Sequence, residues 1–334
     1  VNGKGIYAQN SDITLTGNYI IETPEKGIGI FASKNTNVTG TLEYKYNGST
    51  TGTGMGIIYD QLGAASHTNN ANVKLTNTTN TTGGMIGVYT TAGTGNTLTN
   101  NGDITGSSTA LEFGIVSDGA DIINKGNITL GNANNLTKAN VGIYTRTANS
   151  ITNTGNVSVG DNSIALYGYD VTHTNGNITA GNNGMGIFSK GGNISLTSGS
   201  LVVGTNNAVG VFASGANQTI TSTNSMTIGD TSYGFVIKGT GHNLITDNGT
   251  VTLGNDSVFA YSDKPGTMTN RTQLVSTGSG NYGLYSAGNI KNLADINFGS
   301  GEGNVGIYSI GGTAVNGDTA LGIRPRITVS GSDT

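Results

Sequence analysis

The sequence predicts an all-β protein that folds as a right-handed parallel β-helix, a solenoid of about 13 rungs with about 25 residues each. Three observations lead to this expectation. Gly, Asn and Thr make up 149 of the 334 residues, a composition rich in turns and poor in helix formers. A short motif built around glycine recurs along the whole chain, and a second motif lies between most of its copies.

The composition also excludes several classes of protein. No stretch reaches the ~18 apolar residues of a membrane helix. The net charge of −4 argues against a nucleic-acid partner, which requires a basic surface. Only 10% of residues are charged, and Val, Ile and Tyr are frequent, which is the reverse of a disordered chain. The chain has no Cys, so its stability has to come from repeated packing rather than from disulfides.

The first motif reads apolar, small, apolar, aromatic, as in Ile28-Gly29-Ile30-Phe31. Copies of it, some of them looser, recur at a mean step of (308 − 7)/12, about 25 residues. Their last residues are Tyr7, Phe31, Tyr59, Tyr89, Val116, Tyr144, Tyr167, Phe188, Phe212, Val236, Tyr261, Tyr285 and Tyr308.

The second motif reads Asn-x-Gly-Asn-Ile-Thr-Leu-Gly, as in residues 124–131. A period-two run such as Ile128-Thr129-Leu130 places two apolar side chains on one face and Thr on the other. Three such short runs per repeat cannot stand alone, but they can pair with the equivalent runs above and below at ~4.8 Å. Asn and Gly suit the corners because they tolerate left-handed backbone, and equivalent Asn residues can form hydrogen-bonded ladders.

Other repeat folds fit less well. The period is too short for a propeller blade, and the leucine-rich and calcium-binding nonapeptide signatures are absent. A β-sandwich places turns at similar intervals but does not repeat one motif along the chain.

The aromatic residues that end the first motif allow two interpretations. Strict alternation points the rings outward, where they could form a strip on which sugars stack. Phe at some positions and Val at others favours the second interpretation, a stack of rings that stabilises the scaffold.

The acidic and histidine residues do not predict a catalytic centre. Asp161, Asp230 and Asp256 occupy corner positions, and Asp60, Asp118 and Asp263 follow the first motif on separate rungs. Asp118 and Asp121 are the closest pair, with no basic residue beside them in the sequence. His67, His173 and His242 lie far apart along the chain. We therefore expect no enzymatic activity, no metal site and no cofactor.

Departures from the repeat predict where binding loops are added, because insertions in a solenoid form loops. We expect such loops at residues 42–54, 60–72, 132–138 and 262–266. The first two have the richest chemistry, since exposed Tyr beside acid and amide groups suits carbohydrate or protein recognition. The candidate ligand-binding residues are Tyr44, Tyr46, Asp60, Gln61 and His67.

The iterated Gly-Ile-Tyr and Asn-x-Gly-x-Ile-Thr-Leu-Gly rungs resemble the passenger domains of large bacterial autotransporters of type V secretion, especially fusobacterial adhesins. The resemblance covers nearly the whole chain, and its motifs specify architecture rather than ligand. It implies a protein on the outer membrane whose passenger folds outside the cell and is attached through a C-terminal barrel. Neither that barrel nor a signal peptide is present in this sequence, so we expect an internal segment, residues 1–334, of a longer chain.

These considerations together favour a cell-surface adhesin, with a β-helical stalk whose loops bind host glycans or receptors, or other bacteria. Two alternatives stay open. One is a β-helical enzyme that degrades polysaccharides, and the other is the passenger of a cytotoxin.

Overall fold

The computed structural model describes residues 3–24, 26–47, 52–60, 66–77, 84–106 and 111–329. It is a parallel β-solenoid of about 12 turns, with ~24 residues in each turn. The fold class predicted from the sequence is therefore confirmed. The chain divides into two compact units, Val1–Tyr169 and Asp170–Thr334.

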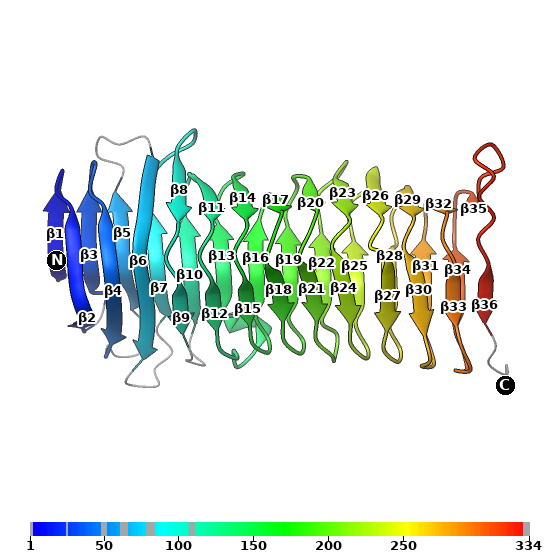
Figure 1. The fold of residues 1–334 in the computed structure, drawn as a ribbon, viewed down its shortest axis with the longest axis horizontal. Coiled ribbons are helices and arrows are strands. Elements are labelled where there is room, and N and C mark those ends of the chain that lie inside the picture. The colour runs from blue at the N-terminus through cyan, green and yellow to red at the C-terminus, as the bar shows by residue number, and fades with distance from the viewer. Residues whose placement is uncertain are drawn as a thin grey trace. The chain divides into compact units, whose positions relative to one another are not determined.

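In the first unit, the strands that carry the glycine-aromatic motif pair in parallel, each with its equivalent in the next turn, and lie side by side in Figure 1. These strands are β1 (Lys4–Gln9), β3 (Ile28–Ser33), β5 (Thr53–Asp60), β7 (Gly84–Thr90), β10 (Glu112–Ser117), β13 (Val141–Thr145) and β16 (Ile164–Gly168).

The rest of each turn in the first unit begins as one long strand and then divides into two. The long strands are β2 (Ile13–Thr23), β4 (Val38–Tyr46) and β6 (Ser66–Asn77). Strand β6 pairs with both β8 and β9, so the division occurs at this turn. The short strands are β8 (Thr97–Asn100), β9 (Ile104–Gly106), β11 (Asp121–Asn124), β12 (Ile128–Leu130), β14 (Ser150–Asn153) and β15 (Val157–Val159).

The second unit has three strands in every turn, as the second motif and its flanking runs predict. The motif strands are β19 (Met185–Ser189), β22 (Val209–Ala213), β25 (Tyr233–Ile237), β28 (Val258–Ser262), β31 (Tyr282–Ser286) and β34 (Val305–Ser309). The strands that follow them are β17 (Asp170–His173), β20 (Ile194–Leu196), β23 (Thr219–Ser222), β26 (His242–Thr246), β29 (Gly266–Asn270), β32 (Asn289–Asn292) and β35 (Ala314–Asn316). The third set is β18 (Asn177–Ala180), β21 (Ser200–Val203), β24 (Ser225–Ile228), β27 (Thr250–Leu253), β30 (Gln273–Ser276), β33 (Ile296–Phe298) and β36 (Ile327–Val329).

The core of each unit is a set of apolar columns, one for each strand position. Along the motif strands of the first unit, Val88, Ile115 and Ile143 are in register and fully buried. In the second unit, Leu244 and Met268 form part of an equivalent column on the next set of strands. Each rung therefore buries its apolar face only by stacking on its neighbours, which is how a solenoid gains stability.

In most copies of the first motif, glycine stands where adjacent rungs approach closely. A Cβ atom built on Gly114 would lie 2.5 Å from the carbonyl oxygen of Gly142, and one built on Gly87 would lie 2.7 Å from that of Gly114. A side chain at these two positions would therefore require a shift of the backbone, whereas Ala165 and Phe259 occupy the equivalent position in two other rungs.

Buried asparagines form hydrogen-bonded ladders, as the sequence predicts. In the first unit, the Nδ2 atoms of Asn69, Asn100 and Asn124 each donate to the Oδ1 atom of the next ladder residue, Asn153 being the last, at 2.7, 2.8 and 2.8 Å. Each of these Nδ2 atoms also donates to a backbone carbonyl two residues ahead, for example Asn124 to Gly126 at 2.8 Å. The ladder thus satisfies buried polar groups where the strand divides.

The register corrects one position of the repeat. We predicted that Tyr59 ends the third copy of the motif, but Ile58 is the residue opposite Phe31 and Tyr89. Tyr59 pairs with Ala32 and Thr90 and is fully buried, because a shift of one residue moves a side chain to the other face of the strand.

Two of the predicted loops are largely strand. Residues 42–46 complete β4 and residues 66–72 belong to β6, so the expectation of loops there is wrong. Residues 48–51 and 61–65 lie outside the described residues. Residues 132–138 do form a loop, which ends in the 3-10 helix Leu136–Lys138, and residues 263–265 form a compact bend before β29.

Candidate functional site

Tyr44 and Tyr46, which we expected to be exposed for ligand binding, are fully buried. The Tyr44 hydroxyl donates to the carbonyl oxygen of Gly27 at 2.8 Å and lies 2.6 Å from the Thr23 hydroxyl. Tyr46 donates to the carbonyl oxygen of Gly52 at 3.0 Å. The alternation of Tyr with charged residues along β4 points the charges outward and the rings inward, so the expectation of exposure is wrong.

The other three candidate residues also form no exposed cluster. His67 is buried, and its ring centroid lies 5.4 Å from that of Tyr59. Burial lowers the pKa of His67, and the neighbouring backbone and charge of Asp60 act against that shift. Asp60 is half-buried and accepts a hydrogen bond from Thr91 Oγ1 at 3.0 Å. Gln61 lies outside the described residues.

The acidic residue Asp118 has a basic neighbour that the sequence analysis missed. Arg146 Nη1 lies 2.9 Å from Asp118 Oδ1, and the Tyr89 hydroxyl donates to the same carboxylate. Stacking brings Arg146 beside Asp118 although 28 residues separate them, because Ser117 and Thr145 are register partners. The ion pair can therefore be recognised in the sequence only by comparing equivalent positions in successive rungs, since the two residues are not neighbours along the chain.

The other two histidines and the corner residue Asp230 are parts of the scaffold. His173 and His242 are buried, and the Oδ1 atom of Asp230 accepts the backbone N–H of Asn255 at 2.7 Å. Among the described residues, no three acidic or imidazole side chains are arranged to hold a metal ion. Within the same residues, no helix is long and apolar enough to cross a membrane.

The most distinctive outward-facing cluster is a group of five tyrosines in the second unit, which we call the tyrosine patch. The motif strands β25, β28, β31 and β34 carry it. Four of the rings are half-buried, and Tyr308 is 43% exposed. The patch consists of Tyr233, Tyr261, Tyr282, Tyr285 and Tyr308.

Three of these rings stack along the solenoid because they are register partners. The centroids of Tyr261 and Tyr285 are 4.8 Å apart, and those of Tyr285 and Tyr308 are 4.9 Å apart, with interplanar angles of 26° and 14°. Tyr282 meets the rings of Tyr285 and Tyr308 edge-on, at 6.2 and 6.1 Å. Both faces of Tyr285 are thus covered, which confirms the ring-stack interpretation and argues against sugars stacking on the inner rings.

An ion pair borders the patch. Lys238 Nζ lies 3.1 Å from Asp263 Oδ2 and 4.7 Å from the ring centroid of Tyr261. Desolvation, followed by the neighbouring tyrosines and Asp263, raises the pKa of Tyr285. A tyrosine hydroxyl is protonated at neutral pH, so that of Tyr285 can donate a hydrogen bond to a ligand.

Part of this patch is recognisable in the sequence. Tyr261, Tyr285 and Tyr308 appear as ends of the repeated motif, but Tyr233 and Tyr282 were missed. Both precede the motif glycine, at a position where most other copies have an aliphatic residue. Tyrosine on both sides of the glycine, as in Tyr282-Gly283-Leu284-Tyr285, was the available signal.

In comparisons with known proteins, no family model, no curated protein and no solved structure matches this chain.

Proposed function

We propose that this chain is part of a bacterial cell-surface adhesin and that the tyrosine patch contacts a glycan or receptor on host cells or on other bacteria. The observation that carries the proposal is the gathering of five tyrosines on the outward face of four adjacent strands. Tyrosine is enriched at binding surfaces because it combines apolar area with a polar group and loses little conformational entropy on binding. The resemblance of the rungs to autotransporter passengers supports the same function.

The geometry of the patch favours recognition through hydroxyl groups and ring edges. Stacking at 4.8 and 4.9 Å leaves no space for a sugar between the rings of Tyr261, Tyr285 and Tyr308. Their outward parts form a row that repeats once per rung, and Lys238 and Asp263 add a donor and an acceptor beside it. A hydroxyl-rich ligand with a regular repeat, such as a glycan chain, fits this arrangement.

The test uses the whole 334-residue chain, a glycan array, and adhesion to epithelial and bacterial cells. The variant Tyr261→Phe/Tyr285→Phe/Tyr308→Phe removes three hydroxyls and keeps the ring stack. We expect it to weaken binding by about tenfold or more, since each hydrogen bond contributes about 1 kcal/mol, while the melting temperature stays unchanged.

The matched control is Tyr144→Phe/Tyr167→Phe in the first unit, where two rings of the same column lie 5.0 Å apart. We expect this variant to bind like the wild type. Equal binding by the patch variant would remove the patch from the proposal, and the absence of any glycan or cell binding would remove adhesion itself. Cleavage of a bound glycan would favour the polysaccharide-degrading alternative.

A further inference from the structure

The last described turn of the second unit carries an insertion that the repeat analysis did not single out. In the preceding turn, three residues separate β32 from β33, whereas ten residues, 317–326, separate β35 from β36. The inserted segment folds back on itself through backbone hydrogen bonds of 2.9 Å in both directions between Asp318 and Ile323. This antiparallel bridge is the single isolated bridge among the described residues.

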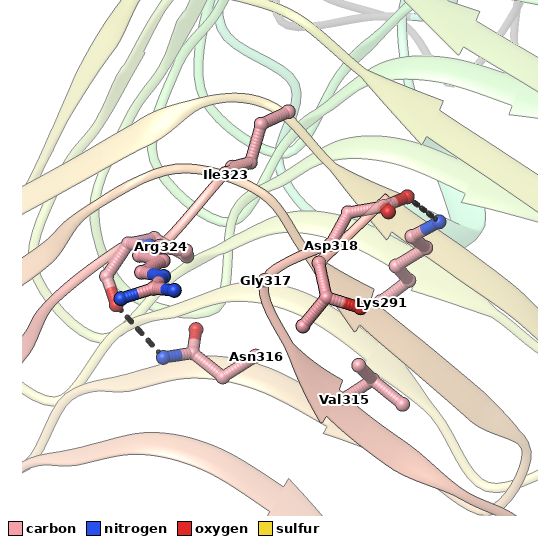
Figure 2. A pocket seen from close by; sticks show the side chains of 9 residues that line it. Lys291, Val315, Asn316, Gly317, Asp318, Ile323 and Arg324 are labelled. Carbon is pink, nitrogen blue, oxygen red and sulfur yellow. Dashed lines mark hydrogen bonds and ion pairs between the residues drawn. The ribbon is translucent and has the colours of Figure 1, made fainter. Parts of the chain in front are cut away.

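Side chains hold the inserted segment in one conformation. The Oδ1 atom of Asp318 accepts the backbone N–H groups of Ala320 and Leu321 at 3.0 and 3.2 Å. Its Oδ2 atom lies 2.6 Å from Lys291 Nζ on β32, as Figure 2 shows. Asn316 Nδ2 donates to the carbonyl oxygen of Pro325 at 2.9 Å, also drawn in Figure 2. The segment is therefore preorganised, which lowers the entropic cost of binding a ligand.

A cleft of about 430 Å³ is lined by this segment, by the end of β35 and by Lys291 of β32. Figure 2 shows Arg324 on one side of the cleft and the Lys291–Asp318 pair on the other. Val315, Ile323 and Pro325 are the apolar residues that line it.

The charges in the cleft do not balance. Lys291 is neutralised by Asp318, but no carboxylate among the described residues lies within ion-pair distance of Arg324. Among the residues that the structure describes, the cleft therefore presents one guanidinium group without a carboxylate partner, and guanidinium is the group best suited to hold a carboxylate through two parallel hydrogen bonds.

We propose that this cleft binds an acidic monosaccharide, such as a uronic acid or a sialic acid at the end of a glycan. Arg324 holds the sugar carboxylate. The Lys291–Asp318 pair faces the sugar hydroxyls, because a hydroxyl both donates and accepts and this pair offers a donor beside an acceptor. The apolar side of the sugar ring lies against Ile323 and Pro325, and the volume suits one or two sugar units.

This site goes beyond the proposed adhesin function and does not depend on the tyrosine patch. The cleft is built on β32, β35 and the inserted segment, whereas the patch lies on the motif strands of the other sheet. A failure of one site therefore leaves the other intact.

The test is titration of the whole chain, by calorimetry and ligand-observed NMR, with glucuronic acid and N-acetylneuraminic acid. Glucose and N-acetylglucosamine serve as neutral probes, and a short peptide with a free C-terminal carboxylate serves as the non-sugar acid. We expect both acidic sugars to bind at least about tenfold more tightly than the neutral sugars, as a charge-assisted hydrogen bond implies. They should also bind more tightly than the peptide, which has the carboxylate but lacks the sugar hydroxyls that face Lys291 and Asp318.

The decisive variant is Arg324→Gln, which removes the guanidinium from an exposed side chain and so leaves folding unchanged. We expect it to lose this preference by about tenfold or more, whereas Arg324→Lys keeps the charge and loses part of it. Arg326→Gln is the matched control, because its side chain is also exposed and does not line this cleft.

Several results would overturn the proposal. They are equal affinity for acidic and neutral sugars, no detectable binding of either acid, an unchanged affinity in Arg324→Gln, and tighter binding of the peptide than of the sugars. The triple phenylalanine variant of the tyrosine patch should bind the acidic sugars like the wild type, which separates the two proposals.

Discussion

The buried asparagine ladder provides the most quantitative test of how the rungs are held together. In the variant Asn124→Ala, the side chain loses three hydrogen bonds of 2.8 Å, two that Nδ2 donates to Asn153 and Gly126 and one that Oδ1 accepts from Asn100. Each bond contributes about 1 kcal/mol, and the buried partners left without a bond add to the cost. We expect a loss of about 3–5 kcal/mol in the free energy of unfolding, measured by urea denaturation monitored by circular dichroism.

The matched control is Asn127→Ala in the same rung. Asn127 also makes ladder bonds, donating to Asp103 Oδ1 at 3.0 Å and accepting from Asn156 Nδ2 at 2.8 Å, but it is exposed. Water replaces exposed hydrogen bonds, so we expect a loss below about 1 kcal/mol. Equal losses in the two variants would refute the reasoning, because burial would then not determine how much the ladder hydrogen bonds contribute to the free energy of unfolding.

Three further changes test other parts of the fold. Gly283→Ala should cost about 1–3 kcal/mol of unfolding free energy, because the new Cβ atom would lie 2.4 Å from the carbonyl oxygen of Gly306. The control Gly299→Ala should cost much less, because no atom lies nearer than 3.3 Å to its Cβ position. Tyr44→Phe should cost about 1–3 kcal/mol in the same urea assay, because it removes two buried hydrogen bonds, one to the Thr23 hydroxyl and one to the Gly27 carbonyl, which keeps the N–H of Met55. Burial raises the pKa of Tyr44 and of Tyr89 to about 12, so absorbance titration of the folded protein should lose one of these two late-titrating groups in the variant. Burial lowers the pKa of His67 from its usual 6.5, so at acidic pH the unfolded state binds more protons than the folded state. The contribution of His67 to the free energy of unfolding should therefore be fully present above pH 6.5 and decrease as the pH falls below it. His67 contributes at most about 1.4 kcal/mol per pH unit to this decrease in the free energy of unfolding. The difference between the urea midpoints at about pH 7.5 and about pH 5.5 should therefore be smaller in His67→Gln than in the wild type, and an identical difference would contradict this prediction.

Much of the fold follows from local sequence because a solenoid contacts mainly its own neighbours. The repeated glycine predicts the close approach of rungs, and the alternation in Ile128-Thr129-Leu130 predicts which side chains enter the core. The corner asparagines also appear as expected, for example Asn162 and Asn183 with φ of 55° and 51°.

The candidate site was harder to predict, because it depends on the register between rungs and on which face of a strand each side chain occupies. We expected Tyr44 and Tyr46 to be exposed, although Glu43 and Lys45, which alternate with them along β4, require that the rings point inward. It also could not show that Tyr282 touches Tyr308, because this contact depends on the exact step between two rungs. The cleft near Arg324 arises from an insertion whose shape depends on side-chain bonds such as that of Lys291 with Asp318.

Hydroxyl-radical footprinting of the tyrosines tests the central claim, that ligands bind the tyrosine patch of the second unit while Tyr44, Tyr46 and Tyr59 support the core. In the free protein, we expect Tyr308 to react readily and the fully buried Tyr44, Tyr46 and Tyr59 to stay unmodified. Addition of a glycan or receptor selected by the adhesion assay should protect Tyr308 and Tyr285. Protection elsewhere with an unchanged patch, or rapid modification of Tyr44 and Tyr46 in the folded protein, would contradict the claim.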